Sequence, residues 1–294
     1  MIIDSHAHYA HGRFDNEFPC LCVDNETYSV CSADRKKLLD EMKSRGIIGS
    51  IEASIGFNDI EKQMQTVREN SSCMWSSLGV HPTRCIHTAW KNRKKLTEYA
   101  EKYQPIAVGE TGLDYHYPRG EQHRLLQKMW FVYQIKLAKK LGLPLILHIR
   151  DADADALKIL KKYRSQLLGG VAHCFSGDAE TAMEYISLGF AVGIGGKLLC
   201  GDEKGRILSE TVKNIPLSSI VVETDAPFVL PDIGEIKCSR NQRRKLCNSS
   251  LILPQLVRRI AELREEDCEY VEEAIFQNTV RVFSLTFEEG MVNE

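Results

Sequence analysis

The fold is decided by the stretch Gly142-Leu143-Pro144-Leu145-Ile146-Leu147-His148-Ile149-Arg150. Residues 143–148 form a short aliphatic run after a glycine, which is typical of a buried β-strand. Before this run, apolar residues recur every three or four positions from 119 to 141, and Gly142 then ends the expected helix. After it, residues 151–163 begin with acidic side chains, which favour the positive end of a helix dipole. The order helix, strand, helix is typical of a parallel α/β fold.

The same alternation extends in both directions along the chain. Short apolar and β-branched runs recur at intervals of roughly 20 to 50 residues, which leave room for a crossover helix between parallel strands. Strands are predicted at residues 2–5, 47–53, 75–80, 106–109, 143–148, 170–173, 190–194 and 220–223. Further helices are predicted at residues 34–45, 59–70, 181–188 and 204–214, with two more within 250–285 that separate near 265–267.

Eight strand-and-helix units without a Pro/Gly/Ser-rich linker predict a (β/α)8 TIM barrel, with residues 1–294 as a single domain. An open doubly wound sheet is the alternative fold. It is disfavoured because no glycine-rich dinucleotide fingerprint follows the first strand. Residues 9–33 are long for a connection between a strand and a helix, and we expect them to form a loop extension beside the barrel mouth.

The composition is that of an ordinary globular protein. The 294 residues carry 38 Lys and Arg against 40 Asp and Glu, for a formal net charge of −2. This balance excludes a highly basic protein that coats nucleic acid without specificity. No run of about 18 apolar residues indicates a membrane span. The N-terminal residues lack the pattern of a signal peptide, so we expect a cytoplasmic protein.

The ten cysteines are scattered, without a C-x-x-C pair. We expect most of them to be small packing residues in a reducing compartment. The alternative is a cysteine zinc site, which needs closely spaced ligands. Cys20 and Cys22 are the only close pair, and one intervening residue is an unusual spacing for structural zinc.

Two histidines lie at the end of the first predicted strand. Side chains alternate along a strand, so His6 and His8 point to the same side, about 6.5 Å apart. Two imidazoles in this arrangement can bind one cation. This pattern alone leaves open an ordinary pair of polar residues at a strand end.

Four more metal-ligating side chains follow other strands. Glu110, His148, His173 and Asp225 lie at the ends of the fourth, fifth, sixth and eighth predicted strands. In a (β/α)8 barrel these ends meet on the face where active sites assemble. A structural network of polar side chains is the alternative, but it gives no reason for such residues on five strands. We therefore expect all six to converge.

Six ligands exceed the three or so protein ligands of a single catalytic zinc ion. They fit two divalent cations about 3.5–4 Å apart that share a bridging carboxylate. Glu110 is central in strand order and is favoured as the bridge, although Asp225 can also serve. Two such ions activate a bound water as the nucleophile. Asp225 can bind an ion, accept the proton of that water, or do both in turn.

The motifs around these residues resemble those of the TatD family of metal-dependent deoxyribonucleases. They are His6-Ala7-His8, Gly79-Val80-His81-Pro82, Gly109-Glu110-Thr111-Gly112-Leu113-Asp114-Tyr115, Leu145-Ile146-Leu147-His148-Ile149-Arg150, His173-Cys174-Phe175-Ser176-Gly177 and Glu223-Thr224-Asp225-Ala226-Pro227. The resemblance covers the chain from the first strand to Phe283. It implies an amidohydrolase-like barrel with 3′→5′ exonuclease activity on single-stranded or short DNA.

The resemblance also implies how the ligands divide. His6, His8, Glu110 and Asp225 hold one ion, and Glu110, His148 and His173 hold the other. Zinc, manganese and magnesium are all associated with the family. Histidine-rich ligation favours a transition metal over magnesium.

Substrate contacts are expected around the metal ligands. His81 can contact a phosphate or donate a proton to the leaving oxygen, or it can simply support a ligand. Arg150 has the geometry to bind a phosphate or an acidic side chain, and Lys197 is a weaker phosphate candidate. The basic stretch 240–245, with Arg243 and Arg244, follows the eighth strand and can neutralise phosphates at the rim.

The sequence therefore predicts a two-metal phosphodiesterase whose partner is DNA, single-stranded or short, or RNA. No obligate protein partner is indicated. A rival hypothesis is hydrolysis of a carbonyl substrate, such as an amide, a lactone or an aminoacyl-tRNA ester, because the same metal centre can polarise a carbonyl. The third hypothesis is a non-catalytic nucleic-acid-binding protein. The complete set of six ligands argues against it, because an unused site has no physical reason to keep every ligand.

Overall fold

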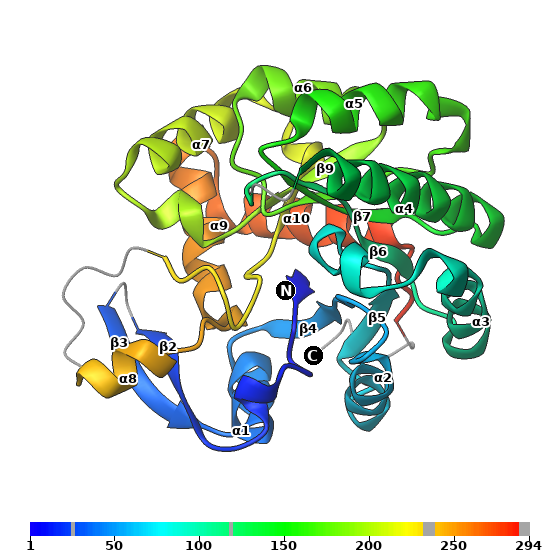
Figure 1. Ribbon diagram of the computed structural model, residues 1–294. Coiled ribbons are helices and arrows are strands. Elements are labelled where there is room, and N and C mark those ends of the chain that lie inside the picture. Colours follow the sequence, from blue (N-terminus) through cyan, green and yellow to red (C-terminus); the bar gives the residue numbers. More distant parts are fainter. Residues whose placement is uncertain (25–26, 118–119, 232–238, 288–294) are drawn as a thin grey trace.

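The computed structural model describes residues 1–24, 27–117, 120–231 and 239–287. Its main sheet contains eight parallel strands, each hydrogen-bonded to the next (Figure 1). In sheet order they are β1 (Ile2–Ala7), β4 (Ile47–Glu52), β5 (Met74–Leu78), β6 (Ala107–Asp114), β7 (Leu145–Arg150), β8 (Gly170–His173), β9 (Phe190–Ile194) and β10 (Ile220–Val222). The eight predicted strands are confirmed in chain order, and β6 extends five residues beyond its predicted end.

The first and last strands meet and close the sheet into a barrel. Ala7 and Ala226 form a parallel bridge. The backbone N–H of His8 donates to the carbonyl of Ala226 at 2.8 Å, and that of Asp225 donates to the carbonyl of His6 at 2.9 Å. Because an open sheet leaves its edge strands unpaired, this closure confirms the TIM barrel and excludes the doubly wound alternative.

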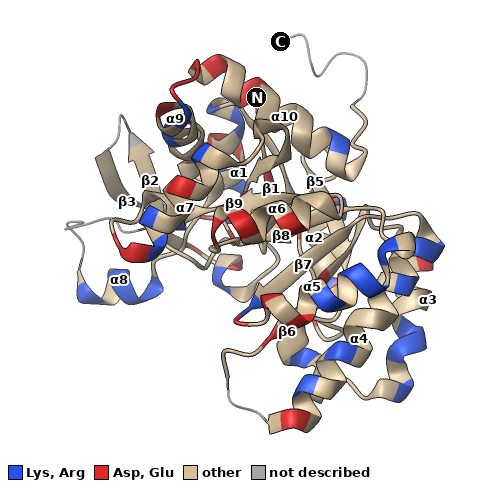
Figure 2. Cartoon of the chain, turned by 90° about the horizontal axis from the view of Figure 1, so that it is seen from above, with Lys and Arg blue, Asp and Glu red and all other residues tan. Residues whose placement is uncertain are grey.

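Helices follow the strands and surround the sheet (Figures 1 and 2). They are α1 (Arg35–Ser44), α2 (Ile60–Glu69), α3 (Arg93–Tyr103), α4 (Gly120–Leu141), α5 (Asp153–Lys162), α6 (Ala179–Ser187), α7 (Glu203–Asn214), α8 (Arg240–Lys245), α9 (Leu253–Arg264) and α10 (Cys268–Phe283). Several begin at an aspartate that accepts a backbone N–H. Asp34 accepts the N–H of Lys37 at 2.8 Å, for example, and so satisfies a donor left free at the start of α1. Residue 119, where the fourth of these helices was predicted to begin, lies outside the described residues.

One end of the barrel is closed by a helix. Phe276 and Phe283 of α10 pack into a buried cluster to which seven of the eight strands contribute one side chain each. These strand residues are Ile3, Ile51, Ala107, Ile146, Val171, Ala191 and Val221. Helix α10 also contacts the short turn Leu217–Ser219, which precedes β10. The helix therefore covers the N-terminal end of the strands, and the opposite end is available for a functional site.

Residues 9–33 are more ordered than the predicted loop extension. They contain an antiparallel hairpin, β2 (Phe18–Asp24) with β3 (Thr27–Ala33), preceded by a short 3-10 turn, Gly12–Phe14. The prediction of an irregular loop is wrong because β2 is a strand buried on both sides, with Leu21 and Val23 on one side and Cys20 and Cys22 on the other. The backbone N–H of Leu21 donates to the carbonyl of Cys247 at 3.0 Å, which attaches the hairpin to the segment after α8.

The cysteines depart from expectation at one place. Cys22 and Cys31 form a disulfide across the hairpin, whereas the sequence pattern indicated free packing thiols. The other described cysteines are free, and Cys20, Cys85 and Cys247 are buried as expected. Among the described helices, none has the length and apolar character that crossing a membrane requires.

Candidate metal centre

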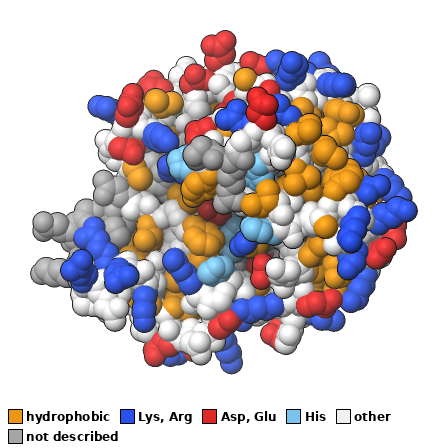
Figure 3. Space-filling view, viewed as in Figure 1, with side chains coloured by type: hydrophobic (Ala, Val, Ile, Leu, Met, Phe, Trp, Pro, Cys, Tyr) orange, Lys and Arg blue, Asp and Glu red, His pale blue; other side chains and the backbone are white. Residues whose placement is uncertain are grey.

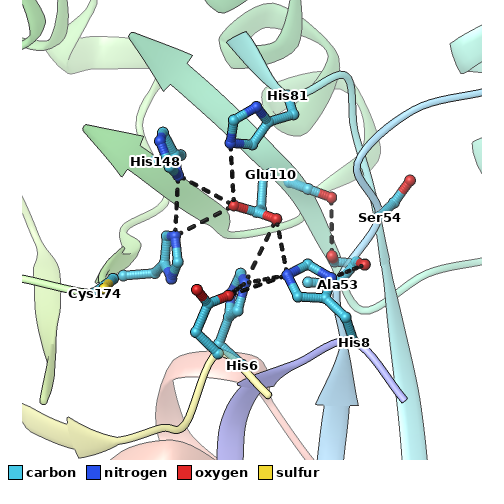
Figure 4. Close-up of polar contacts among 12 residues, drawn as sticks. His6, His8, Ala53, Ser54, His81, Glu110, His148 and Cys174 are labelled. Atoms are coloured by element: carbon cyan, nitrogen blue, oxygen red, sulfur yellow. Dashed lines mark hydrogen bonds and ion pairs between the residues drawn. The ribbon is translucent and has the colours of Figure 1, made fainter. Parts of the chain in front are cut away.

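The six predicted ligand side chains converge at the C-terminal end of the barrel (Figure 4). They come from five strands and from the turns that follow them. Figure 3 shows histidine side chains around a hollow near the middle of this face. Glu110 of β6 lies at the centre of the group, and both of its carboxylate oxygens face histidines.

The first set of ligand atoms surrounds one oxygen of Glu110. The Nε2 atoms of His6 and His8 lie 3.5 and 3.3 Å from Glu110 Oε1, and 3.6 and 3.2 Å from Asp225 Oδ1. The two Nε2 atoms are 3.3 Å apart. Four ligand atoms, two from β1 and one each from β6 and the turn after β10, therefore face a common point.

The second set surrounds the other oxygen of Glu110. His148 Nδ1 and His173 Nε2 lie 3.3 and 3.2 Å from Glu110 Oε2, and 3.2 Å from each other. His148 and His173 are direct partners in the register of β7 and β8, so the sheet itself places them side by side. His81, just after β5, approaches the same oxygen with Nε2 at 3.7 Å.

These separations fit metal ions. An ion bound tetrahedrally by nitrogen and oxygen at about 2.1 Å holds its ligand atoms about 3.4 Å apart. The separations in the first set are 3.2 to 3.6 Å, and those among Glu110, His148 and His173 are 3.2 to 3.3 Å. In both sets a pair of imidazole nitrogens faces each other, and a cation between them satisfies both lone pairs. The donor set therefore fits two cations that share Glu110.

Hydrogen bonds on the outer side of the rings orient the ligands. His8 Nδ1 lies 2.9 Å from the carbonyl of Ala53, so this nitrogen carries a proton and Nε2 is directed at the site, where an ion would replace any proton on it. His148 is reversed: its Nε2 lies 3.3 Å from Asp114 Oδ2, which leaves Nδ1 for the site. His173 Nδ1 lies 3.4 Å from Glu223 Oε1 as an ion pair, without the geometry of a hydrogen bond.

The charges of the site reinforce one another. Burial lowers the pKa of His8, but the hydrogen bond with Asp225 and the charge of Glu110 outweigh it and raise the pKa to about 9. Burial alone would raise the pKa of Glu110, yet the surrounding histidines hold it well below its usual range. Glu110 is therefore a carboxylate at neutral pH, as a bridging ligand must be.

His81 differs from the other histidines. Burial and the neighbouring His148 lower its pKa to about 3, so its ring is neutral at physiological pH. Its Nδ1 accepts the backbone N–H of Thr83 at 3.1 Å. The single ring proton is therefore on Nε2, which faces the site, and His81 can donate a hydrogen bond there.

The predicted substrate residues are less closely grouped. Arg150 is exposed at the end of β7, with its guanidinium carbon 5.9 Å from the ring centre of Tyr117. Lys197 lies near enough to Cys174, the neighbour of His173, for its charge to act on that thiol. Arg243 and Arg244 are exposed on α8, beside the hairpin (Figure 2). Among the contacts of the described residues, none joins these two arginines to a predicted ligand.

The structure also reveals residues that sequence reasoning missed. A cavity of about 200 Å³ opens beside His8 and is lined by His11, Lys62, Arg84 and Phe228, among others. The ring centre of Phe228 lies 5.9 Å from that of His8. A larger groove of about 650 Å³, which includes Lys95, shares Asp59 and Arg84 with this cavity. Phe228 directly follows the Asp225-Ala226-Pro227 motif, and this was the one local signal available; the other lining residues come from separate loops.

Comparison with known proteins agrees with this geometry. Residues 3–284 match the family model of TatD related DNases. The chain is 32% identical to the 3′-5′ ssDNA/RNA exonuclease TatD of Rahnella sp. (strain Y9602), over 89% of this chain and 97% of that protein. It is 28% identical to the metal-dependent hydrolase YabD of Bacillus subtilis (strain 168), over 97% of this chain and all of that protein.

A solved structure shows the same fold. The TatD homologue YJJV of Escherichia coli K12 superimposes with a TM-score of 0.77 at 24% identity, over 97% of this chain and 98% of that chain. The expected barrel and the expected enzyme class, a metal-dependent hydrolase of the TatD type, are thereby confirmed. Because the family model matches residues 3–284 of the chain, this chain belongs to the family of TatD related DNases.

Proposed function

We propose that this protein is a two-metal exonuclease that removes nucleotides from the 3′ end of single-stranded DNA or RNA. One observation carries the proposal: the two oxygens of Glu110 face two separate sets of ligand atoms. A carboxylate shared between two cations is the arrangement used for in-line displacement at phosphorus. The printed names of relatives such as the Rahnella enzyme support this class of substrate.

The ligand assignment follows the two sets. His6, His8 and Asp225 would hold one ion, His148 and His173 would hold the other, and Glu110 would offer one carboxylate oxygen to each. Imidazole-rich ligation favours zinc or manganese over magnesium. When bound, the ions lower the pKa of water to near neutrality and neutralise the charge that develops on the phosphate.

The protein side chains then position the substrate phosphates and deprotonate the attacking water. Asp225 is the group best placed to accept a proton from the attacking water, because its side chain is more exposed than that of Glu110, 17% against 3%. The neutral His81 donates from Nε2 to a phosphate oxygen. Arg150 and Lys197 bind the flanking phosphates.

The cavity beside His8 supplies a place for the terminal base. Phe228 is 38% exposed, and the guanidinium carbon of Arg13 lies 5.7 Å from its ring centre. An exposed aromatic face near a metal centre suits base stacking. Arg84 and Lys95 border the connected groove, which gives the strand a path away from the site. Arg243 and Arg244 contact phosphates farther along the strand.

The proposal extends to organisation and location. The chain acts as a single barrel domain that includes the hairpin, in the cytoplasm. This is supported by the contacts of β2 with residue 247 and by the buried thiols of Cys20, Cys85 and Cys247.

The test is a cleavage assay on protein reconstituted separately with zinc, manganese and magnesium. The substrates are 3′-labelled single-stranded DNA, double-stranded DNA, RNA and an aminoacyl ester. We expect release of labelled mononucleotide from single strands, and its loss in Glu110→Ala. The surface variant Glu101→Gln, whose carboxylate pairs with Lys140, is the matched control and should keep wild-type activity.

Other outcomes would overturn the proposal. Cleavage of the ester alone would assign the site to carbonyl chemistry. Binding of single strands without cleavage under all three metals would leave the protein a nucleic-acid-binding module. Unchanged DNA cleavage in Glu110→Ala would refute the two-metal site.

A further inference from the structure

A second cluster of potential ligands lies on the hairpin. Cys20 of β2 is the direct register partner of Cys31 of β3, and Cys22 lies two residues further along β2. Because side chains alternate across a strand, all three cysteines project from the same face. The Sγ atom of Cys20 lies 3.1 Å from that of Cys31 and 4.0 Å from that of Cys22, and all three sulfurs lie within 4.8 Å of one another.

A fourth cysteine lies beside them. Cys247 forms a parallel bridge with Cys20: its N–H donates to the carbonyl of Pro19 at 2.9 Å and its carbonyl accepts the N–H of Leu21 at 3.0 Å. Paired residues on neighbouring strands project to the same side of a sheet. Cys31, Cys20 and Cys247 therefore lie side by side on three adjacent strand segments, with their side chains on the same face. Its buried thiol donates to the carbonyl of Lys245 at 3.5 Å and lies outside the group of three sulfurs, so it joins a metal site only if its side chain rotates about χ1 toward Cys20.

We propose that Cys20, Cys22, Cys31 and Cys247 form a structural site for zinc or another thiophilic divalent ion, distinct from the histidine and carboxylate centre. Four thiolates without a carboxylate or an open position make a closed site of the structural kind. In such a site, bonds of about 2.3 Å place the sulfurs about 3.8 Å apart. The separations of the Cys20 sulfur from those of Cys31 and Cys22, 3.1 and 4.0 Å, lie on either side of this value, and the third pair, Cys22 and Cys31, must first separate from its disulfide.

The ion binds the reduced form of the hairpin. Cys22 and Cys31, joined as a disulfide here, first accept two electrons and two protons from a dithiol, which becomes a disulfide itself. The four thiols then each lose a proton as the metal binds. In a reducing compartment the thiol form is the one available to the ion.

Such an ion joins two parts of the chain that are far apart in sequence. Three ligands lie in the hairpin, and the fourth follows the basic helix α8 by two residues. The next residue, Asn248, donates from Nδ2 to the carbonyls of Thr224 and Val229, at 2.9 and 3.1 Å, on either side of Asp225. The site therefore fixes the hairpin and α8 relative to the barrel mouth.

The test uses cobalt as a spectroscopic substitute for zinc. Full-length protein is reduced with a dithiol. The dithiol is then removed under anaerobic conditions, and the protein is titrated with Co²⁺. Only sulfur ligands give the intense near-ultraviolet thiolate-to-cobalt absorption, so the histidine centre does not contribute to it. We expect the amplitude of this band to reach that of one thiolate-bound cobalt per chain, whatever share of the added cobalt the histidine centre takes up, and the band to be displaced by zinc. Cys20→Ser should abolish it, and Cys247→Ser should weaken cobalt binding at least tenfold.

Matched controls separate the site from general thiol effects. Cys268→Ser and Cys73→Ser change cysteines outside the cluster and should leave the band intact. If Cys20→Ser fails to fold, the wild-type protein still decides the question: zinc should slow the reaction of Cys31, the partly exposed member of the cluster, with a thiol-specific reagent. Absence of the band in reduced wild-type protein, its persistence in Cys20→Ser, or an unchanged reaction rate of Cys31 with zinc would refute the site. None of these readouts depends on nuclease activity.

Discussion

The barrel mouth and the hairpin each gather potential metal ligands, but they do so by opposite means. At the mouth, side chains from β1 to the turn after β10 meet because a closed barrel brings the ends of its strands together. On the hairpin, three cysteines meet because two adjacent strands pair locally. The first arrangement suits catalysis, since its mixed ligands leave room for water and substrate; the second is all sulfur and suits a structural ion. A catalytic metal site and a structural metal site therefore differ in two ways: in the chemical type of their ligands, and in whether the ligands come from distant strands or from adjacent ones.

The largest expected effect comes from the bridge. Glu110→Gln keeps the shape of the side chain but removes the charge that faces both ligand sets. We expect the cleavage rate of single-stranded DNA to fall by at least about a thousandfold, or ~4 kcal/mol. Metal analysis should show fewer than two ions at the mouth, with the cysteine site still filled. Full activity with two ions retained at the mouth would contradict the bridging role.

A smaller effect is expected from the partner of His148. Asp114 fixes the ring so that Nδ1 faces the site, and Asp114→Asn should weaken the second ion by about 10- to 100-fold. Metal competition titrations will measure this. Glu210→Gln, which removes a surface partner of Lys213, is the control and should leave both affinities unchanged. Equal weakening of both ions would show that the two sets are not separable.

Metal affinity at the mouth should depend on pH. The raised pKa of His8, about 9 in the metal-free protein, means that below this pH a proton occupies the ring and competes with the ion. The affinity of the first ion should therefore rise with pH by up to about tenfold per unit, and level off near pH 9. Calorimetry in buffers of different ionisation enthalpy measures the proton release. A pH-independent affinity between pH 7 and 9 would show that His8 does not titrate in this way.

Substitution of a residue that positions the substrate should reduce activity less than substitution of a metal ligand. Phe228→Ala removes the aromatic face beside His8, and loss of one stacked base costs about 1–3 kcal/mol. We expect the KM for single-stranded DNA to rise about tenfold or more, with kcat little changed and metal content unaffected. Phe228→Tyr keeps the face and should restore KM. A selective fall in kcat would instead place Phe228 near the reacting atoms.

The smallest expected effect on chemistry comes from the cysteine site. Cys247→Ser should leave cleavage of a dinucleotide within about twofold, because no cysteine of the cluster is a predicted ligand at the mouth. It should lower the thermal midpoint of the reduced, zinc-loaded protein by a few degrees. Scanning calorimetry with and without zinc checks this. An equal loss of dinucleotide cleavage would mean that the two sites are coupled.

The sequence predicted most of what the barrel imposes. Each strand has its own aliphatic run, and a ligand such as His148 or His173 follows from where that run ends. The length of β6 was underestimated because Thr111 and Gly112 interrupt its apolar run, although both pair with β7. Long-range packing could not be predicted from the sequence. The cavity lined by Arg84 and Phe228, for example, forms between loops that no local sequence pattern relates.

The hairpin shows most clearly what sequence patterns alone could not predict. A C-x-C pair looked unsuitable for zinc because spacing along one strand ignores the partner strand. Cross-strand pairing of Cys20 with Cys31, and the bridge to Cys247, become visible only once the chain is folded. Likewise, the position of Arg243 and Arg244 depends on where α8 lies, and it lies beside the hairpin.

The most direct test of the central claim is a crystal structure of the zinc- or manganese-loaded protein with anomalous scattering measured at the metal edge. If two ions share Glu110, we expect two peaks at the barrel mouth, about 3.5–4 Å apart, with one oxygen of Glu110 on each. The first should contact His6, His8 and Asp225, and the second should contact His148 and His173. A single peak, or two peaks of which only one contacts Glu110, would contradict it.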